Sequence, residues 1–334
     1  MTWLTWRQFR VPALSVFVGL AAIGVVLAVT GPELVGQTDF SDQDFLYGGT
    51  ALLMYLLPAV IGVFWGVPMI TRELEGGTHS LIWNQTVTRR HWLAAKVAVG
   101  VLAAMVAAGL LSLAVTWWAS PIDAVANQQT DRGMLNWMSP VVFAARGVAP
   151  IGYAAFSFVL GVACGILLRR TVLAMAVTLV ALLAVMLAVP FLVRPYFLPA
   201  LEETVAITGD TVMGIHGDNS GVLEGLIVAE PAGAWVLADE TVDSAGNVVS
   251  PLPDFVQDCV PRPGENPKGG PGVAPPPGGM QACMAQLGER GYHQRITYQP
   301  GYRFWALQWI ELAFFLALSA LLTWLCFRRL RHLS

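Results

Sequence analysis

The sequence predicts an all-α integral membrane protein with six transmembrane helices, and three observations lead to this fold class. Of its 334 residues, 55% are hydrophobic and only 12% are charged, with a mean hydropathy of +0.60. A chain this apolar and this poor in charge falls outside the range of soluble globular proteins. Six apolar runs have the length of about 20 residues that a helix needs to cross a bilayer, and basic residues gather at their ends.

The first ten residues predict a short helix that lies in the membrane interface. Trp3 and Trp6 recur about one helical turn apart, and Arg7 and Arg10 add positive charge, a composition typical of interfacial helices. An ordinary start of the first span, with tryptophans at the interface, is the alternative. The first span itself is predicted over residues 11–30, which is longer than the apolar region of a signal peptide, about 7–15 residues.

Five further apolar runs complete a transmembrane region over residues 11–194 and a separate sixth span near the C-terminus. These predicted spans are residues 51–70, 97–118, 150–168, 172–193 and 304–327. Only a turn at Arg169-Arg170 separates the fourth span from the fifth, so the two are expected to form a tight helical hairpin. Gly161 and Gly165 make a G-x-x-x-G pattern in the fourth span, for which we expect packing against another helix of the same chain.

Basic residues cluster at four places separated by even numbers of spans, so all four are expected on one side of the membrane. The clusters are Arg7 with Arg10, the stretch 71–96, Arg169 with Arg170, and the tail 328–334. The positive-inside rule places this side, and with it both termini, in the cytoplasm of a cell whose plasma membrane holds the protein. Residues 31–50, 120–149 and 195–303 then lie outside, where Arg132, Arg146 and Arg194 are basic residues that do not fit the rule.

The segment 195–303 is predicted to be a large extracytoplasmic segment between the fifth and sixth spans. Strand-like alternation occurs around residues 204–215 and 221–236, whereas 261–279 is too rich in Pro and Gly for a helix or strand. Cys259 and Cys283 bracket this Pro/Gly-rich part. Outside the cytoplasm a disulfide between them is chemically allowed and would stabilise the segment by about 3 kcal/mol; two free thiols are the alternative.

Glu311 is the most notable ionisable group within a predicted span, with Gln308 one helical turn before it. A carboxylate inside a membrane is expected to face a cavity or a partner rather than lipid. Arg146 and Arg303 are the partners that the sequence suggests. A structural ion pair and a contact with a substrate are the two interpretations.

No motif predicts a catalytic residue, a metal site or a bound cofactor. The five histidines are dispersed, without a second His or Cys at ligand spacing. No G-x-x-x-x-G-K-[ST] loop occurs, so the chain does not bind ATP in that way. A membrane-embedded enzyme would need a nucleophile with a base or a metal set, and neither is visible.

The stretch 71–96 is the one long polar, positively charged interruption among the apolar runs. Arg72, Glu73 and Glu75 are charged, and Gly76-Gly77 break the exit from the second span. Thr78 can then cap a helix. Arg89-Arg90 precede the return to the membrane. Such an element is suited to dock in a groove of a soluble protein, and a connector resting on the lipid surface is the alternative.

This stretch resembles the first cytoplasmic loop of ABC-2-type transporter permeases, especially those of actinobacteria. The resemblance rests on R-E-x-E-x-G-T at residues 72–78, followed by Arg89-Arg90 and W-L-A-A-K at 92–96. The N-terminal WLTWRQFR is similar to that family's interfacial helix, and residues 298–305, with Gln308 and Glu311, are similar to its approach to the sixth span.

The resemblance implies a membrane subunit without its own ATPase, which pairs as a homodimer or with a second permease. ATP and Mg would be bound by a separate ABC ATPase subunit, and the first cytoplasmic loop would carry a coupling helix that touches it. The residues then expected at this contact are Arg72, Glu73, Glu75, Gly77, Thr78, Arg89 and Arg90. Charge reversal at Glu73 or Arg89 is expected to uncouple ATP hydrolysis from transport without unfolding the spans.

The function predicted from the resemblance is the permease half of an exporter for a hydrophobic or amphipathic compound, such as a drug, an antibiotic or a lipid-like molecule. Besides the ATPase, the expected partners are membrane lipids, with no nucleic acid. The alternative is a non-transporting membrane protein whose outer segment binds a partner and whose cytoplasmic loop relays that state.

Overall fold

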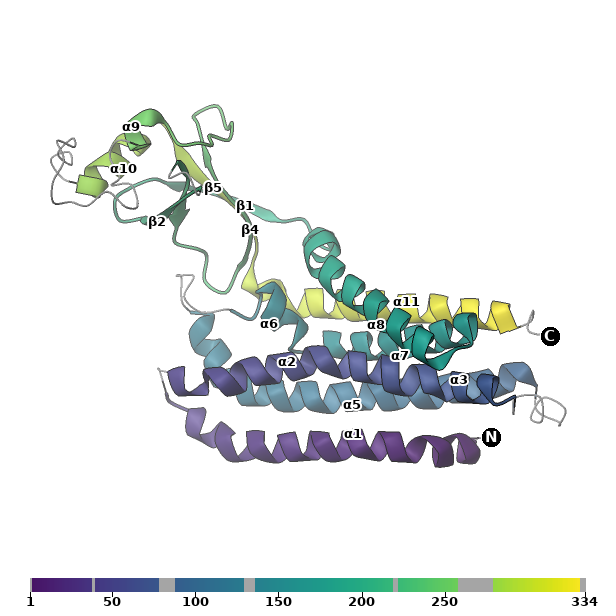
Figure 1. Ribbon diagram of the computed structural model, residues 1–334. Coiled ribbons are helices and arrows are strands. Elements are labelled where there is room, and N and C mark those ends of the chain that lie inside the picture. The colour runs from purple at the N-terminus through teal and green to yellow at the C-terminus, as the bar shows by residue number, and fades with distance from the viewer. Residues whose placement is uncertain are drawn as a thin grey trace, which may run out of the picture. The chain divides into compact units, whose positions relative to one another are not determined.

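The chain folds into two compact units, a helical bundle and a smaller domain built on β-strands. The computed structural model describes residues 2–37, 40–77, 88–128, 136–218, 222–257 and 279–330. The bundle comprises Met1–Val125, Ser139–Leu198 and Tyr302–Ser334, and the second unit, here called the sheet domain, comprises Ala126–Met138 and Pro199–Gly301. The two units are coloured along the chain in Figure 1.

Six helical segments of the described chain are long and apolar enough to cross a membrane, in agreement with the six predicted spans. They are built from α1 (Thr2–Thr30), α2 (Asp44–Val60) with α3 (Val67–Glu75), α5 (Arg89–Ala126), α7 (Ala149–Leu168), α8 (Thr171–Ala188) and α11 (Phe304–Leu330). Shorter helical pieces are η1 (Gly31–Leu34), η2 (Ser41–Gln43), η3 (Ile61–Gly66), α6 (Pro140–Ala144), η4 (Val189–Val193), η5 (Arg194–Tyr196) and η6 (Gly301–Arg303).

The helices α1 and α5 extend well beyond their predicted spans. The helix α1 runs without a break from Thr2 into the apolar run, so the first ten residues are its opening turns rather than a separate helix. Whether these turns lie on the lipid surface stays a prediction. The helix α5 has 38 residues and at 1.5 Å per residue is about 57 Å long. Since a hydrocarbon core is about 30 Å thick, its ends extend beyond the apolar layer.

The second span is one continuous rod whose middle, η3, is wound as a π-helix between α2 and α3. Pro58, just before η3, lacks an N–H and changes the backbone hydrogen bonding there. The Pro58 carbonyl also accepts a hydrogen bond from the Ser157 hydroxyl of α7. This bond joins the second span to the central helix α7.

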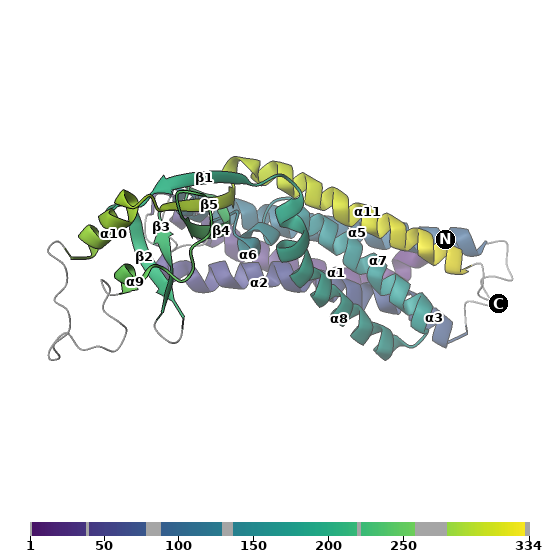
Figure 2. The same cartoon turned by 90° about the horizontal axis from the view of Figure 1, so that it is seen from above.

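The helix α7 is the centre of the bundle. In its apolar stretch 78% of the residues are buried, against 11% for α1, and it packs against α11, η3 and α8 (Figure 2). A Cβ on Gly161 would clash with the Gly62 carbonyl, and one on Gly165 would lie 3.1 Å from the Thr71 Cγ2. The G-x-x-x-G pattern therefore serves packing within the chain, as predicted.

A two-residue turn joins α7 to α8, which confirms the predicted helical hairpin. Arg169 ends α7 in the left-handed conformation, with φ of 54°, and its N–H donates to the Gly165 carbonyl at 3.0 Å. This left-handed cap reverses the chain at once, although a non-glycine residue adopts it at some cost.

The sheet domain corrects the all-α prediction, which holds for the bundle alone. Its elements are β1 (Leu201–Ala206), β2 (Val212–Gly217), β3 (Leu223–Val228), β4 (Trp235–Val242), α9 (Asp254–Gln257), α10 (Gly279–Glu289) and β5 (His293–Gln299). Strands β1, β5 and β4 form an antiparallel sheet in that order, and β2 pairs with β3. The alternation around 204–215 indicated strands correctly, but a turn around Thr208 and Thr211 divides it into β1 and β2.

The sheet domain has a hydrophobic core of its own. Its members come from the strands, the connections and both helices: Ile207, Leu223, Leu226, Leu252, Val256, Cys283, Met284 and Leu287. The buried Gln294 of β5 joins the two sheets, because its amide donates to the Leu226 carbonyl of β3 at 3.1 Å and to Asp239 Oδ1 of β4 at 2.6 Å. The segment between the fifth and sixth spans is therefore a folded domain over most of its described length.

Candidate functional site

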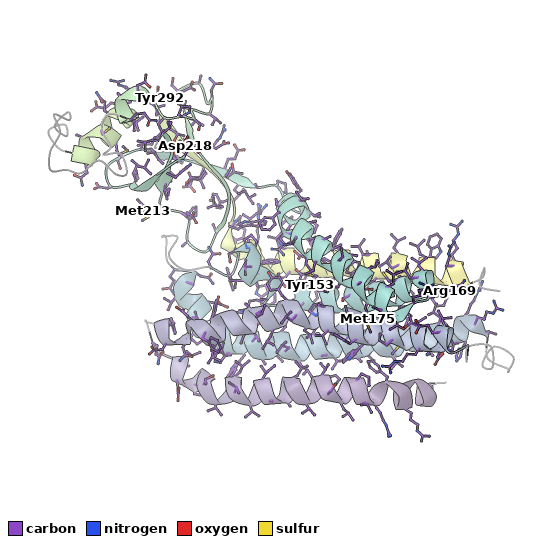
Figure 3. All side chains as sticks on the ribbon, viewed as in Figure 1. Tyr153, Arg169, Met175, Met213, Asp218 and Tyr292 are labelled. Atoms are coloured by element: carbon purple, nitrogen blue, oxygen red, sulfur yellow. The ribbon has the colours of Figure 1, made fainter. Side chains whose placement is uncertain are left out.

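The basic clusters predicted from the sequence gather at one end of the bundle, where both chain ends also lie (Figure 1). We call this the basic end. Its described arginines are all exposed: Arg7, Arg10, Arg72, Arg89, Arg90, Arg169, Arg170, Arg328 and Arg329. Figure 3 labels Arg169 at this end, well away from Tyr153 inside the bundle.

At the basic end, Glu73 is held inside the bundle. It is only 8% exposed, and its Oε1 lies 2.6 Å from Lys96 Nζ of α5. Trp92 Nε1, also of α5, donates to Glu73 Oε2 at 3.0 Å, and Lys96 Nζ donates to the Met69 carbonyl at 2.9 Å. These bonds fasten α3 to α5 where the chain leaves the second span.

Glu75 fastens the same turn of α3 to a third helix. Its carboxylate accepts from the Thr171 N–H at 2.6 Å and from the Thr171 hydroxyl at 2.8 Å. The Thr171 hydroxyl also lies 2.7 Å from that of Thr71. A carboxylate is favourable at this position, because Thr171 begins α8 and a helix N-terminus carries partial positive charge.

The other predicted coupling residues are placed differently. Arg72, Arg89 and Arg90 are exposed, and Gly77 adopts a positive φ of 66° just after α3. Thr78 and the loop residues 79–87 lie outside the described residues. Their contact with an ATPase therefore stays a prediction.

The burial of Glu73 changes one expectation. Charge reversal there would place a second positive charge beside the buried Lys96, which destabilises a folded protein strongly. Glu73 is thus unsuited to separate coupling from folding, whereas the exposed Arg89 remains suited to it.

At the opposite end of the bundle, here called the far end, Glu311 forms a fully buried ion pair with Arg194. Both side chains are 0% exposed, with Arg194 Nε 2.7 Å from Glu311 Oε2 and Arg194 Nη2 2.9 Å from Oε1. The Tyr153 hydroxyl donates to the same carboxylate. Such a bidentate, charge-assisted pair is strong and geometrically specific. The predicted partners were wrong: Arg146 pairs elsewhere, and Arg194 occupies this place.

Arg194 reaches Glu311 because the end of α8 changes its winding. Pro190 stands in the π-helical turn η4, and Arg194 begins η5 immediately after it. Its guanidinium carbon lies 4.3 Å from the centre of the Phe143 ring, and Nη1 donates to the Pro140 carbonyl at 3.3 Å. Arg194 therefore also fixes the short helix α6.

Gln308 acts as a cap on the central helix. Its Oε1 accepts from the N–H groups of Val148 and Ala149 at 2.9 and 2.7 Å, where α7 begins. Its Nε2 donates to the Phe143 carbonyl at 2.9 Å. Since the first N–H groups of a helix have no partner within it, Gln308 satisfies two that would otherwise be unpaired in an apolar layer. Gln308 and Glu311 both hold structure at the far end.

A second ion pair at the far end was not predicted. Arg146 Nε lies 3.2 Å from Asp123 Oδ2, and the Tyr47 hydroxyl donates to Asp123 Oδ1 at 3.0 Å. The guanidinium carbon of Arg146 lies 5.0 Å from the Tyr47 ring centre. The sequence signal for this pair was the misfit of Arg146 with the positive-inside rule.

The cysteines differ by unit. Cys164 and Cys326 are free and buried in the bundle, as expected for apolar filling residues. Cys283 is buried in the core of the sheet domain, whereas Cys259 lies outside the described residues, so their pairing stays a prediction. Within the described residues, no three His, Cys, Asp or Glu side chains gather as metal ligands.

Comparison with known proteins matches part of the bundle to a family. Residues 33–194 match the family described as ABC-2 membrane transporter related, a range that runs from η1 to η5 and includes the loop between α3 and α5. Neither a curated protein nor a solved structure matches the chain. The match agrees with the resemblance noted in the sequence, and the chain is a multi-pass membrane protein. Through residues 33–194, the bundle is similar to the family described as ABC-2 membrane transporter related.

Proposed function

We propose that this chain is the permease subunit of an ATP-binding-cassette exporter in the plasma membrane. It moves a hydrophobic or amphipathic compound outward, paired with a second permease or a second copy of itself. The family match over residues 33–194 carries the proposal. ATP hydrolysis is assigned to a separate subunit, because the sequence has no phosphate-binding loop of its own. The basic end then faces the cytoplasm, following the positive-inside rule.

The contacts at the basic end support a route by which force from an ATPase enters the bundle. Glu73 ties α3 to α5, and Glu75 ties α3 to α8. A push on the loop between α3 and α5 therefore moves three helices together instead of unwinding one end. The exposed Arg89 and Arg90 at the start of α5 supply positive charge for an acidic surface on the partner.

The proposal is tested by purifying the chain from its native membranes and identifying co-purifying proteins. An ATPase with a phosphate-binding loop should be recovered with it. In reconstituted vesicles of that complex, the double variant Arg89→Glu with Arg90→Glu should lower transport per ATP hydrolysed.

The matched control is Arg89→Lys with Arg90→Lys, which keeps both positive charges and should keep coupling. Recovery of the chain without any nucleotide-binding protein would count against the proposal. Equal coupling in the Glu and Lys variants would show that these arginines do not contact the ATPase. The permease assignment would then be tested by the co-purification alone.

The folded sheet domain favours a second candidate function. A domain with its own core offers a surface for binding a partner outside the cell, and the cytoplasmic loop would relay the bound state without transport. Vesicles that hold the complex and accumulate an amphipathic compound on addition of ATP would exclude this alternative.

A further inference from the structure

A groove opens between α7 and α11 near the basic end of the bundle. It has a volume of about 450 Å³. Its walls are apolar, and Arg328 and Arg329 stand at one end. The apolar lining consists of Ala163, Ile166 and Leu167 from α7 and Leu322, Leu325 and Cys326 from α11.

The groove opens toward the lipid side of the bundle. Leu167 is 59% exposed and Leu325 43%, and in a membrane-spanning helix such side chains face hydrocarbon. The neighbouring Trp324 is also exposed, and tryptophan is enriched where hydrocarbon meets headgroups. The groove therefore extends from the hydrocarbon layer to the headgroup layer, as a phospholipid does.

The charge at the end of the groove selects the kind of headgroup. Among the described residues neither Arg328 nor Arg329 forms an ion pair, and both are exposed. Arginine guanidinium binds phosphate oxygens through two parallel hydrogen bonds. The C-terminus of α11 carries a partial negative charge of roughly half an elementary charge, which repels an anion. The two full positive charges of Arg328 and Arg329 outweigh this repulsion.

We propose that this groove binds an anionic phospholipid of the surrounding membrane, with an acyl chain between α7 and α11 and the phosphate on Arg328 and Arg329. The groove differs from the predicted coupling contact, and the inference stands whether or not an ATPase acts on the chain. This lipid stays bound in the groove and is not the transported compound.

The test uses the full chain purified in detergent and titrated with phosphatidylglycerol or phosphatidylcholine, with bound lipid counted by native mass spectrometry. The wild type should bind phosphatidylglycerol more tightly. Arg328→Gln with Arg329→Gln should weaken this binding by about fivefold for each arginine. Ala163→Phe should weaken it as well, because the new ring fills the groove while both arginines remain.

The matched control is Arg169→Gln with Arg170→Gln, which removes the same charge from the same end of the bundle but not from the groove. It should bind phosphatidylglycerol as the wild type does. Equal affinity of the wild type for the two lipids would overturn the proposal. An equal loss of phosphatidylglycerol affinity in the control would also overturn it, since the attraction would then be a general property of the basic end. Unchanged binding in a monodisperse Ala163→Phe variant would overturn it too, since the lipid would then not occupy the groove.

Discussion

Replacing Glu311 by Gln is the sharpest probe of the far end, because it removes one charge and little else. Gln has nearly the same volume, so no large cavity forms. Arg194 would keep its full charge at 0% exposure without the carboxylate that now lies 2.7 and 2.9 Å away. Breaking a buried pair from one side costs about 3–5 kcal/mol, because the remaining charge is uncompensated. We expect Glu311→Gln to lower the free energy of unfolding by that amount.

Two further variants isolate burial as the cause. The double replacement Arg194→Met with Glu311→Leu removes both charges and should regain most of the loss, since a well-packed apolar pair replaces a buried ion pair at little cost. Glu240→Gln breaks the Arg295–Glu240 pair of the sheet domain, which has the same 2.7 Å separation but side chains 30% and 37% exposed. Exposed pairs contribute about 0–1 kcal/mol.

The assay is unfolding of the purified chain in mixed micelles by a rising fraction of sodium dodecyl sulfate, followed by tryptophan fluorescence. The reasoning would be refuted by a loss for Glu311→Gln no larger than that for Glu240→Gln. It would also fail if the double variant were less stable than Glu311→Gln, because the charge left behind could not then be the source of the loss.

Two other predictions concern packing and the second helix clamp. Gly161→Ala should lower stability by about 1–3 kcal/mol, because its Cβ would clash with the Gly62 carbonyl, whereas Gly24→Ala has open space around it and should be neutral or slightly stabilising. If both replacements changed the stability equally in the same assay, the close contact at Gly161 would not be the cause. Lys96→Met should lower the midpoint of unfolding by sodium dodecyl sulfate, because Glu73 is then buried without its counter-charge. Adding Glu73→Gln to this variant should regain part of the lost stability, and no recovery would contradict the pairing.

Hydropathy predicted which segments form membrane helices but not how deeply each is buried. The helix α1 is at least as apolar as α7, yet 11% of its apolar stretch is buried against 78%. What distinguishes α7 is the small residues that admit a second backbone, such as Gly161 beside Gly62. An apolar side chain satisfies lipid and protein neighbours equally well, so only such contacts separate a central helix from a peripheral one.

The sequence predicted only part of the candidate site, because it shows which residues are charged but not which of them pair. Glu311 was visible as a carboxylate within a span, but Arg194 lies 117 residues away along the chain, and no local pattern joins the two. Asp123 and Arg146 are only 23 residues apart, yet their pairing depends on a helix longer than the apolar run suggested. At the basic end the sequence grouped Glu73 with Arg89 as charged loop residues, although Glu73 is buried.

The two buried pairs at the far end sharpen the prediction of orientation. Arg146 and Arg194 opposed the positive-inside rule, but at 1% and 0% exposure they belong to the interior of the bundle and not to the loops that the rule counts. The exposed arginines at the basic end therefore still predict that this end faces the cytoplasm. A cysteine at Arg170 should react with a membrane-impermeant maleimide only after the cells are opened, and one at Ser244 in the sheet domain should react in intact cells, both measured above the unmodified chain. The reverse labelling would mean that the basic end faces outward, in which case the loop between α3 and α5 could not meet a cytoplasmic ATPase.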